Sequence, residues 1–201
     1  EDSISIAAKH LASDARIGAL GVRLTYTDGR LQHTARKFRS LRNELLDLAR
    51  PLLKLMPYRK RSQLMLNQYF YGDYDTWCDW VSGAFMMFRT NILDQLPGKK
   101  LDERFFMYGE DQLWCYQFQE LGLKSYYLSG TTVIHIHNAS TSADKQLQLL
   151  KKFVTMERLI MQYRIGSGIG YHLFNVVFTA KEMARYWIKV AVYRISGKKM
   201  R

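Results

Sequence analysis

The chain has 201 residues, of which 47% are hydrophobic and 13% aromatic, so it can bury a core and is neither disordered nor fibrous. Its two cysteines, Cys78 and Cys115, are too few for a disulfide scaffold or a four-cysteine zinc site and are expected to be reduced thiols. The net charge is +12, but the central segment 62–144 is acidic, with ten acidic and five basic residues, between basic flanks. This distribution argues against a nucleic-acid binder and favours a cation-using site held against an anionic surface.

The hydrophobic pattern predicts helices and strands along the whole chain. In chain order these are a helix at Ser3–Ala12, a strand at Ile17–Tyr26, a basic helix at Arg36–Met56, helices at Asn91–Leu96 and Glu110–Leu121, and strands at Lys124–Leu128 and Thr131–Ile136. Pro51 predicts a break in the basic helix near Arg50, although leucines recur at helical spacing on both sides. Beyond about residue 142 long helical patterns take over, so we expect one domain at 1–142 and a helical tail at 143–201.

A carboxylate pair opens the segment EDQLWCYQFQELG. On a helix that begins at Glu110, Asp111 shares a face with Cys115 and Phe118, so its carboxylate lies at the N-terminal end of the buried stripe. Such an acid has two interpretations: a helix-terminal residue favoured by the helix dipole, or a general base whose pKa is set by burial. This segment alone favours the first interpretation.

Two further segments carry residues suited to chemistry. In TTVIHIHNAST at 131–141, strand alternation places His135 and His137 on one side of a strand end. A His-x-His pair can ligate a metal, but two ligands do not make a site, and a structural role is the more common one. In DWVSGAFMMFR at 79–89, the small-residue step at 82–84 allows the close approach of a ligand or a backbone, and a tightly packed core strand is the alternative.

Taken together and in order, these three segments resemble the C-terminal half of the family 2 glycosyltransferases of the GT-A fold. The upstream piece DARIGALGVRLTYTDGRLQ at 14–32 also resembles that family, especially its rhamnosyltransferase-like branch in bacterial surface polysaccharide synthesis. The resemblance covers roughly residues 1–142 and rests on four motifs in register, each of them weak alone. It implies an α/β fold, the C-terminal part of a Rossmann-like GT-A domain followed by the helical tail.

The resemblance assigns roles to particular residues. The family's catalytic base falls on Asp111, which would take the proton from an acceptor hydroxyl as that oxygen attacks the anomeric carbon with inversion. Glu110 would be a neighbouring acid that helps to position the acceptor. The residues that would line the donor and acceptor cleft are Asp79, Trp80, Ser82, Gly83 and Ala84.

The resemblance also implies a divalent cation, Mg²⁺ or Mn²⁺, on the diphosphate of the donor. The histidine that helps to hold this cation in many members falls on His135, whereas His137 falls where the family often has glycine. The Asp-x-Asp motif that carries the cation belongs to a nucleotide-binding half, which the resemblance places before residue 1. The Asp-Tyr-Asp triplet at 73–75 matches the Asp-x-Asp pattern, but it lies downstream of the strand that this motif follows in the family, so we expect a loop there.

The tail is strongly basic, with twelve basic and two acidic residues at 145–201. The uncharged stretch between Arg164 and Lys181 has sixteen residues, fewer than the ~17–25 that span a bilayer. The next segment, Glu182–Ile195, alternates Lys and Arg with Trp187 and other apolar residues, which is typical of a helix lying on an anionic membrane. The alternative is a helix pair packed on the catalytic domain with its charges solvated.

The resemblance therefore implies that the full-length protein is an inverting, metal-dependent glycosyltransferase. It would move a sugar from a nucleotide-diphosphate donor to a glycan or lipid-linked acceptor, with no nucleic-acid partner. The expected location is the cytoplasmic side of the plasma membrane, with the chain peripheral on its inner face. This chain would be the acceptor-side half of the enzyme, inactive alone. The alternative function is a non-catalytic basic adaptor that binds a membrane surface or a polyanion.

Overall fold

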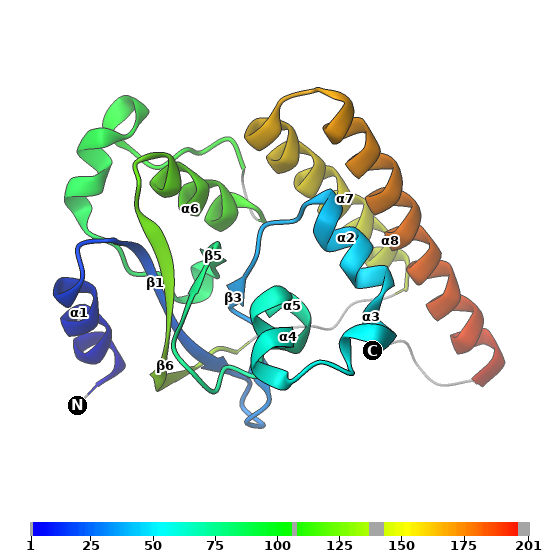
Figure 1. Cartoon of the computed structure of the whole chain (residues 1–201), viewed down its shortest axis with the longest axis horizontal. Helices are drawn as coiled ribbons and strands as arrows, with labels where there is room; N and C mark the ends of the chain where they lie inside the picture. Colours follow the sequence, from blue (N-terminus) through cyan, green and yellow to red (C-terminus); the bar gives the residue numbers. More distant parts are fainter. Residues whose placement is uncertain (1, 106–107, 137–142, 197–201) are drawn as a thin grey trace. The chain divides into compact units, whose positions relative to one another are not determined.

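The computed structural model describes residues 2–105, 108–136 and 143–196, and the side chains of 147–192 within the last range (Figure 1). These residues form two compact units. The first, called here the sheet unit, consists of Glu1–Phe38 and Pro51–His137; the second, the helical unit, consists of Arg39–Arg50 and Asn138–Arg201. The boundary expected at residue 142 lies in the undescribed range 137–142, which also includes His137. The helical unit takes in residues 39–50, which the sequence analysis assigned to the first domain.

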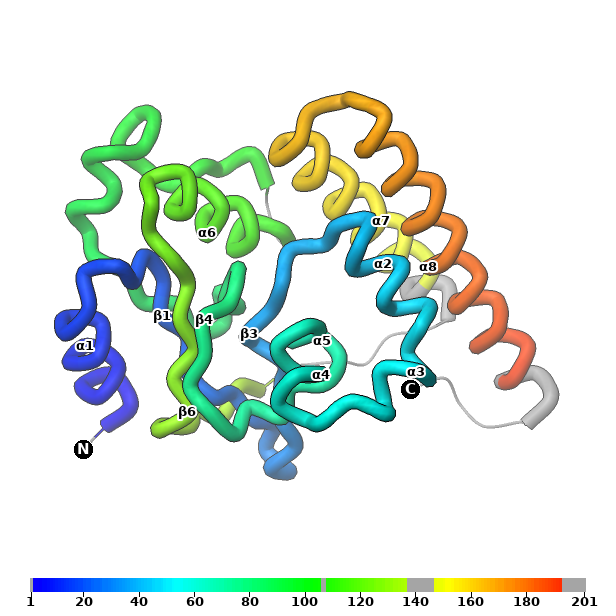
Figure 2. The backbone as a smooth tube through the Cα atoms, in the orientation of Figure 1, coloured from blue at the N-terminus to red at the C-terminus, as the bar shows by residue number. Residues whose placement is uncertain are grey.

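The sheet unit is built on a mixed four-stranded sheet. Its strands are β1 (Ile17–Thr25), β2 (Leu31–Gln32), β4 (Thr76–Cys78) and β6 (Lys124–Ile134), in the order β2-β1-β6-β4. Figure 2 shows β1, β6 and β4 side by side; β1 and β6 are parallel and the other pairs antiparallel. The central strand β1 is apolar along almost its whole length because both of its faces are covered. The α/β class predicted from the sequence is confirmed at this level.

Strand β6 differs from the prediction of two short strands joined by a turn at 129–130. It is one strand of eleven residues whose register with β1 shifts, because Leu128 lies opposite Val22 and Thr132 lies opposite Arg23. The intervening residues form an irregularity like a β-bulge, which local sequence does not distinguish from a turn. Asp75 stabilises this irregularity, because its carboxylate accepts hydrogen bonds from the Ser129 amide at 2.7 Å and from the Ser129 hydroxyl at 2.6 Å.

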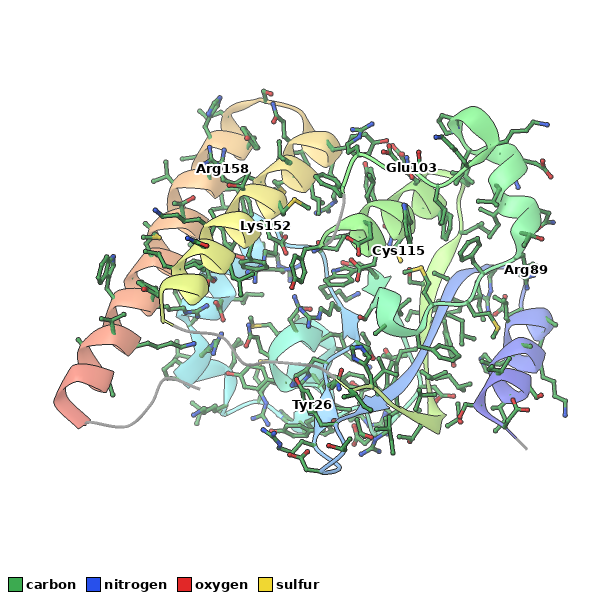
Figure 3. The ribbon with its side chains drawn as sticks, turned by 180° about the vertical axis from the view of Figure 1, so that it is seen from behind. Tyr26, Arg89, Glu103, Cys115, Lys152 and Arg158 are labelled. Carbon is green, nitrogen blue, oxygen red and sulfur yellow. The ribbon has the colours of Figure 1, made fainter. Side chains whose placement is uncertain are left out.

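Short helices and a small second sheet complete the sheet unit. They are α1 (Ser3–Ser13), α4 (Tyr58–Leu64), α5 (Leu66–Tyr69), η1 (Gly83–Phe85), η2 (Thr90–Gln95), η3 (Pro97–Lys99) and α6 (Glu110–Glu120), with β3 (Ala35–Arg36) paired antiparallel to β5 (Trp80–Val81). The guanidinium of Arg89 joins α1 to β1 by donating to the carbonyl oxygens of Ile17 at 2.8 Å, Asp14 at 2.9 Å and Leu11 (Figure 3). The predicted helices at the N-terminus and at 110–121 are confirmed, and the one at 91–96 is a 3₁₀ segment.

A glycine on β1 allows β5 to lie close to the sheet. A Cβ atom placed on Gly21 would lie 2.7 Å from the Cβ of Val81, which is closer than real side chains approach. Because β5 runs directly into the Ser82-Gly83-Ala84 step, this contact fixes where the step lies over the sheet.

The helical unit consists of α2 (Leu41–Leu48), α7 (Ala143–Ile165) and α8 (Ile169–Ser196), with α3 (Arg50–Leu53) beginning at its border. Its apolar core is formed by Val154, Met161, Tyr171, Phe174 and Phe178. The basic helix predicted from Arg36 begins only at Leu41, where the Ser40 hydroxyl accepts a hydrogen bond from the Asn43 amide at 3.2 Å. The break expected near Arg50 is confirmed between α2 and α3. Across the described helices, none has the length and apolarity to cross a membrane.

Candidate active site

The acid pair Glu110-Asp111 lies in the first turn of α6, after an unusual chain reversal. Tyr108 and Gly109 both have positive φ, 76° and 99°, and Gly109 is the N-cap of the helix. A tyrosine in the left-handed region is strained, and such strain is found most often where a structure must position a functional group. The sequence predicted that Asp111 shares the face of Cys115 and Phe118, and both of those side chains are buried (Figure 3 labels Cys115).

The carboxylate of Asp111 is held by the small-residue step that follows β5. The backbone N–H of Gly83 donates to Asp111 Oδ2 at 3.1 Å, and the Gln112 N–H donates to Oδ1 at 2.8 Å. Gly83 and Ala84 are exposed, so the carboxylate lies beside a solvent-facing backbone without a large side chain over it. Residues 28 positions apart are thus brought together, and this contact is what the small residues at 82–84 permit.

The pKa of Asp111 is raised above its ordinary value, chiefly because the carboxyl is largely removed from water. The Gly83 N–H acts in the opposite direction by stabilising the ionised form, and the negative charge of Glu110 raises the pKa further. A carboxylate with a raised pKa is a stronger base than a free aspartate. The first turn of α6 therefore presents a group suited to proton transfer.

Two buried polar atoms, one on the residue next to Asp111 and one on β5, lack hydrogen-bond partners among the described residues. They are Oε2 of Glu110 and Nε1 of Trp80, neither of which accepts or donates a hydrogen bond within that part of the chain. Unsatisfied buried polar groups are rare in native proteins, and one explanation is a ligand that completes their bonding.

Arg36 is a residue of this site that sequence reasoning missed. It lies on β3 directly opposite Trp80 on β5, with its guanidinium 5.1 Å from the centre of the indole ring. Its positive charge acts to lower the pKa of Asp111. The sequence analysis assigned Arg36 to a helix, and no local signal marks the two-residue strand that carries it.

His135 lies immediately after β6, at the end of the sheet where β1 also ends near Tyr26 (Figure 3). Gln32 Nε2 donates to the carbonyl oxygens of His135 at 2.6 Å and Thr25 at 3.3 Å, so Gln32 Oε1 is the atom that faces His135 Nδ1 at 2.8 Å. Because Oε1 accepts, the ring Nδ1 is the donor of this hydrogen bond. This arrangement is typical of histidines oriented for metal binding.

His135 fits a divalent cation as one ligand, but it does not complete a site. Among the described residues there is no group of three or more His, Cys, Asp or Glu side chains placed to hold a metal ion. The triplet at 73–75 lies in a loop, as expected, and its two carboxylates accept hydrogen bonds from Tyr58 and Ser129.

Asp79 lies apart from the contacts of Asp111. Its carboxylate pairs with Lys37 Nζ at 3.2 Å and accepts from the Phe38 N–H at 2.8 Å. It lines a depression of about 420 Å³ with Trp77, Cys78, Gln119 and Lys124, a lining that does not include the acid pair. The structure thus brings Ser82, Gly83 and Ala84 to Asp111, with Trp80 on the preceding strand, and places Asp79 and His135 in other contacts.

The cysteines are not candidates for nucleophilic chemistry. Both are unpaired and buried, and burial raises the pKa of Cys115 to about 12 and that of Cys78 well above its ordinary value. Comparison with known proteins adds no relative to this geometry, since no family model, no curated protein and no solved structure matches the chain.

Proposed function

We propose that this chain is the acceptor-side half of an inverting glycosyltransferase with a GT-A-like fold, and that Asp111 is its catalytic base. The observation that carries the proposal is the Asp111 carboxylate, raised in pKa by burial and positioned by the Gly83 amide beside an exposed small-residue step. The resemblance to family 2 glycosyltransferases assigns the same residue the same role. The sugar nucleotide would be bound mainly by residues outside this chain.

In the proposed reaction, Asp111 removes the proton from an acceptor hydroxyl. The freed oxygen lone pair forms the new bond to the anomeric carbon, while the bond from that carbon to the diphosphate breaks on the opposite face. The nucleoside diphosphate leaves with the electron pair, and the proton remains on Asp111 until solvent takes it. A base of this kind contributes about 10²–10⁴-fold to the rate.

The neighbouring groups have supporting roles in this proposal. Glu110, which precedes Asp111 in the first turn of α6, would help to position the acceptor. His135 would be one ligand of a Mg²⁺ or Mn²⁺ ion, which when bound neutralises charge on the diphosphate; the remaining ligands would come from outside the described residues.

The test uses the full-length protein that contains this chain, a panel of nucleotide-diphosphate sugars, and glycan and lipid-linked acceptors. Release of nucleoside diphosphate should require both a matching donor and an acceptor hydroxyl, and the product should have the inverted anomeric configuration. A correctly folded protein that releases nothing with any pair would reject the proposal in favour of a non-catalytic adaptor. A product that retains the donor configuration would reject the assignment of Asp111 as the base of a single displacement.

A further inference from the structure

Helix α8 carries apolar side chains on both its buried and its exposed faces, and one lysine is buried with the inward apolar residues. Its inward face carries Phe174 and Phe178, which are fully buried, and Lys181, whose side chain is only 5% exposed. Its outward face carries large apolar side chains, including Val176 at 70% and Trp187 at 54% exposure. A helix in contact with water normally buries its apolar residues and exposes its lysines.

Several exposed apolar residues of α8 share one side of the helix, while Ile188 and Val192 are exposed on another side. Ile169 and Trp187 are separated by about five full turns at 3.6 residues per turn, so they lie on the same side of the helix. Between them on that side, Leu173, Val176, Ala180 and Ala184 are apolar and exposed, and Met183 is half-buried. We call this set the apolar stripe: Ile169, Leu173, Val176, Ala180, Ala184 and Trp187. It is about 27 Å long at 1.5 Å per residue and contains no charged residue.

The buried position of Lys181 is stabilised by two acidic residues of α2. Lys181 Nζ binds Asp47 Oδ2 at 2.6 Å and also contacts Glu44, and both of these acids are almost fully buried. Arg185 reaches the same Asp47 oxygen at 2.6 Å. Because these basic side chains are committed to buried carboxylates, α8 cannot rotate to bury its apolar stripe without breaking the ion pairs.

The charge of the helical unit indicates which partner covers the stripe. The unit contains fifteen basic and five acidic residues, a net charge of +10. Two copies of such a unit would repel each other, whereas an anionic lipid surface would attract it. Trp187, on the stripe, is a residue type enriched at membrane–water interfaces. No described helix can cross a bilayer, so the contact would be in the plane of the surface.

We propose that the apolar stripe of α8 inserts into the interface of an anionic lipid bilayer, with the helix axis parallel to the membrane plane. This proposal does not rest on glycosyl transfer. It also differs from the surface expected from sequence, because Lys181 and Arg185 point inward to Asp47 and do not meet lipid headgroups. The net positive charge of the helical unit, which includes exposed basic residues of α7 such as Lys151 and Arg158, supplies the attraction.

The test measures binding of the whole chain to vesicles that contain about one-third phosphatidylglycerol, by sedimentation and by Trp187 fluorescence with brominated lipids. The variant Val176→Glu/Trp187→Glu changes two exposed positions of the stripe and should bind at least about 30-fold more weakly while keeping its helical circular dichroism. The matched control is Leu159→Glu, an exposed apolar position on α7 outside the stripe, which should bind within about threefold of wild type.

Raising the salt concentration from about 0.05 to 0.5 M should weaken binding, and vesicles of phosphatidylcholine alone should bind poorly, because the attraction is partly electrostatic. The proposal fails if wild type does not bind anionic vesicles or if the stripe variant binds as wild type does. It also fails if the stripe mediates concentration-dependent dimerisation without vesicle binding, since a second copy would then be the occupant.

Discussion

Replacing Lys181 with methionine should destabilise the helical unit strongly. The substitution keeps most of the aliphatic stem but removes the cation that faces Glu44 and Asp47, whose side chains are 2% and 3% exposed. Removing one partner of a buried ion pair typically costs about 3–5 kcal/mol, because the other charge is left uncompensated. Here Glu44 retains Arg39 at 3.0 Å and Asp47 retains Arg50 at 2.5 Å, so we expect a smaller loss, about 2–3 kcal/mol.

The pKa of Asp47 gives an independent measure of the same network. Burial alone would raise this pKa, but hydrogen bonds from Lys181 and Arg50 outweigh it and hold the pKa at about 2, against 3.8 for an unperturbed aspartate. A carboxyl whose pKa is depressed in the folded state stabilises the protein above its unfolded pKa, and the contribution is lost as pH falls from 3.8 through about 2. It amounts to about 2 kcal/mol at neutral pH.

The assay is denaturant and thermal unfolding followed by circular dichroism. At pH 7 the Lys181→Met variant should unfold about 4–12 °C below wild type, and this difference should shrink as pH approaches 2. The control is Lys189→Met, an exposed lysine two turns further along α8, which should change stability by no more than about 0.5 kcal/mol. Equal effects of the two substitutions, or a Lys181→Met variant as stable as wild type, would refute the role of the buried network.

Two further predictions concern Asp111. Burial raises the pKa of Asp111 in the folded state, so its stabilising contribution is present below the unfolded pKa of 3.8 and is lost as pH rises through the folded pKa. Asp111→Asn should therefore raise the free energy of unfolding at pH 7, and this gain should shrink as the pH is lowered. A destabilised variant would contradict this. Gly83→Pro removes the N–H that stabilises the ionised carboxylate, at a first-turn position that follows an extended Ser82. The pKa of Asp111 should therefore rise, and the pH dependence of turnover should move upward. Gly83→Ala keeps the N–H and should leave the profile unchanged, and identical profiles for the two variants would reject this contact.

Elements that depend on local pattern could be predicted from the sequence. Strand β1 is a short apolar run closed by a turn, and α6 has helical spacing and ends before Gly122, whose φ is positive, so both were placed within a residue or two. The position of Asp111 at the start of the buried stripe followed from the same periodicity. The loop at 73–75 was also recognised, because it lies outside any strand.

Contacts between distant residues could not be predicted in this way. Gln32 orients His135 across 103 positions, and β3 places Arg36 opposite Trp80 in a strand too short to have a pattern. The leucines of α2 have regular helical spacing, yet Leu45 and Leu48 are more than half exposed while Glu44 is buried. Partners more than 130 positions away decide that orientation, since Lys181 lies on α8.

The turnover of Asp111→Asn in the full-length protein tests the central claim most directly. It should be measured at saturating donor together with donor affinity, and beside Asp94→Asn, which replaces an exposed aspartate of the sheet unit. If Asp111 is the base, turnover falls by about 10²-fold or more while donor affinity and the Asp94→Asn control stay as in wild type. Near-normal turnover in Asp111→Asn would contradict the account and make Glu110 the next candidate for the base.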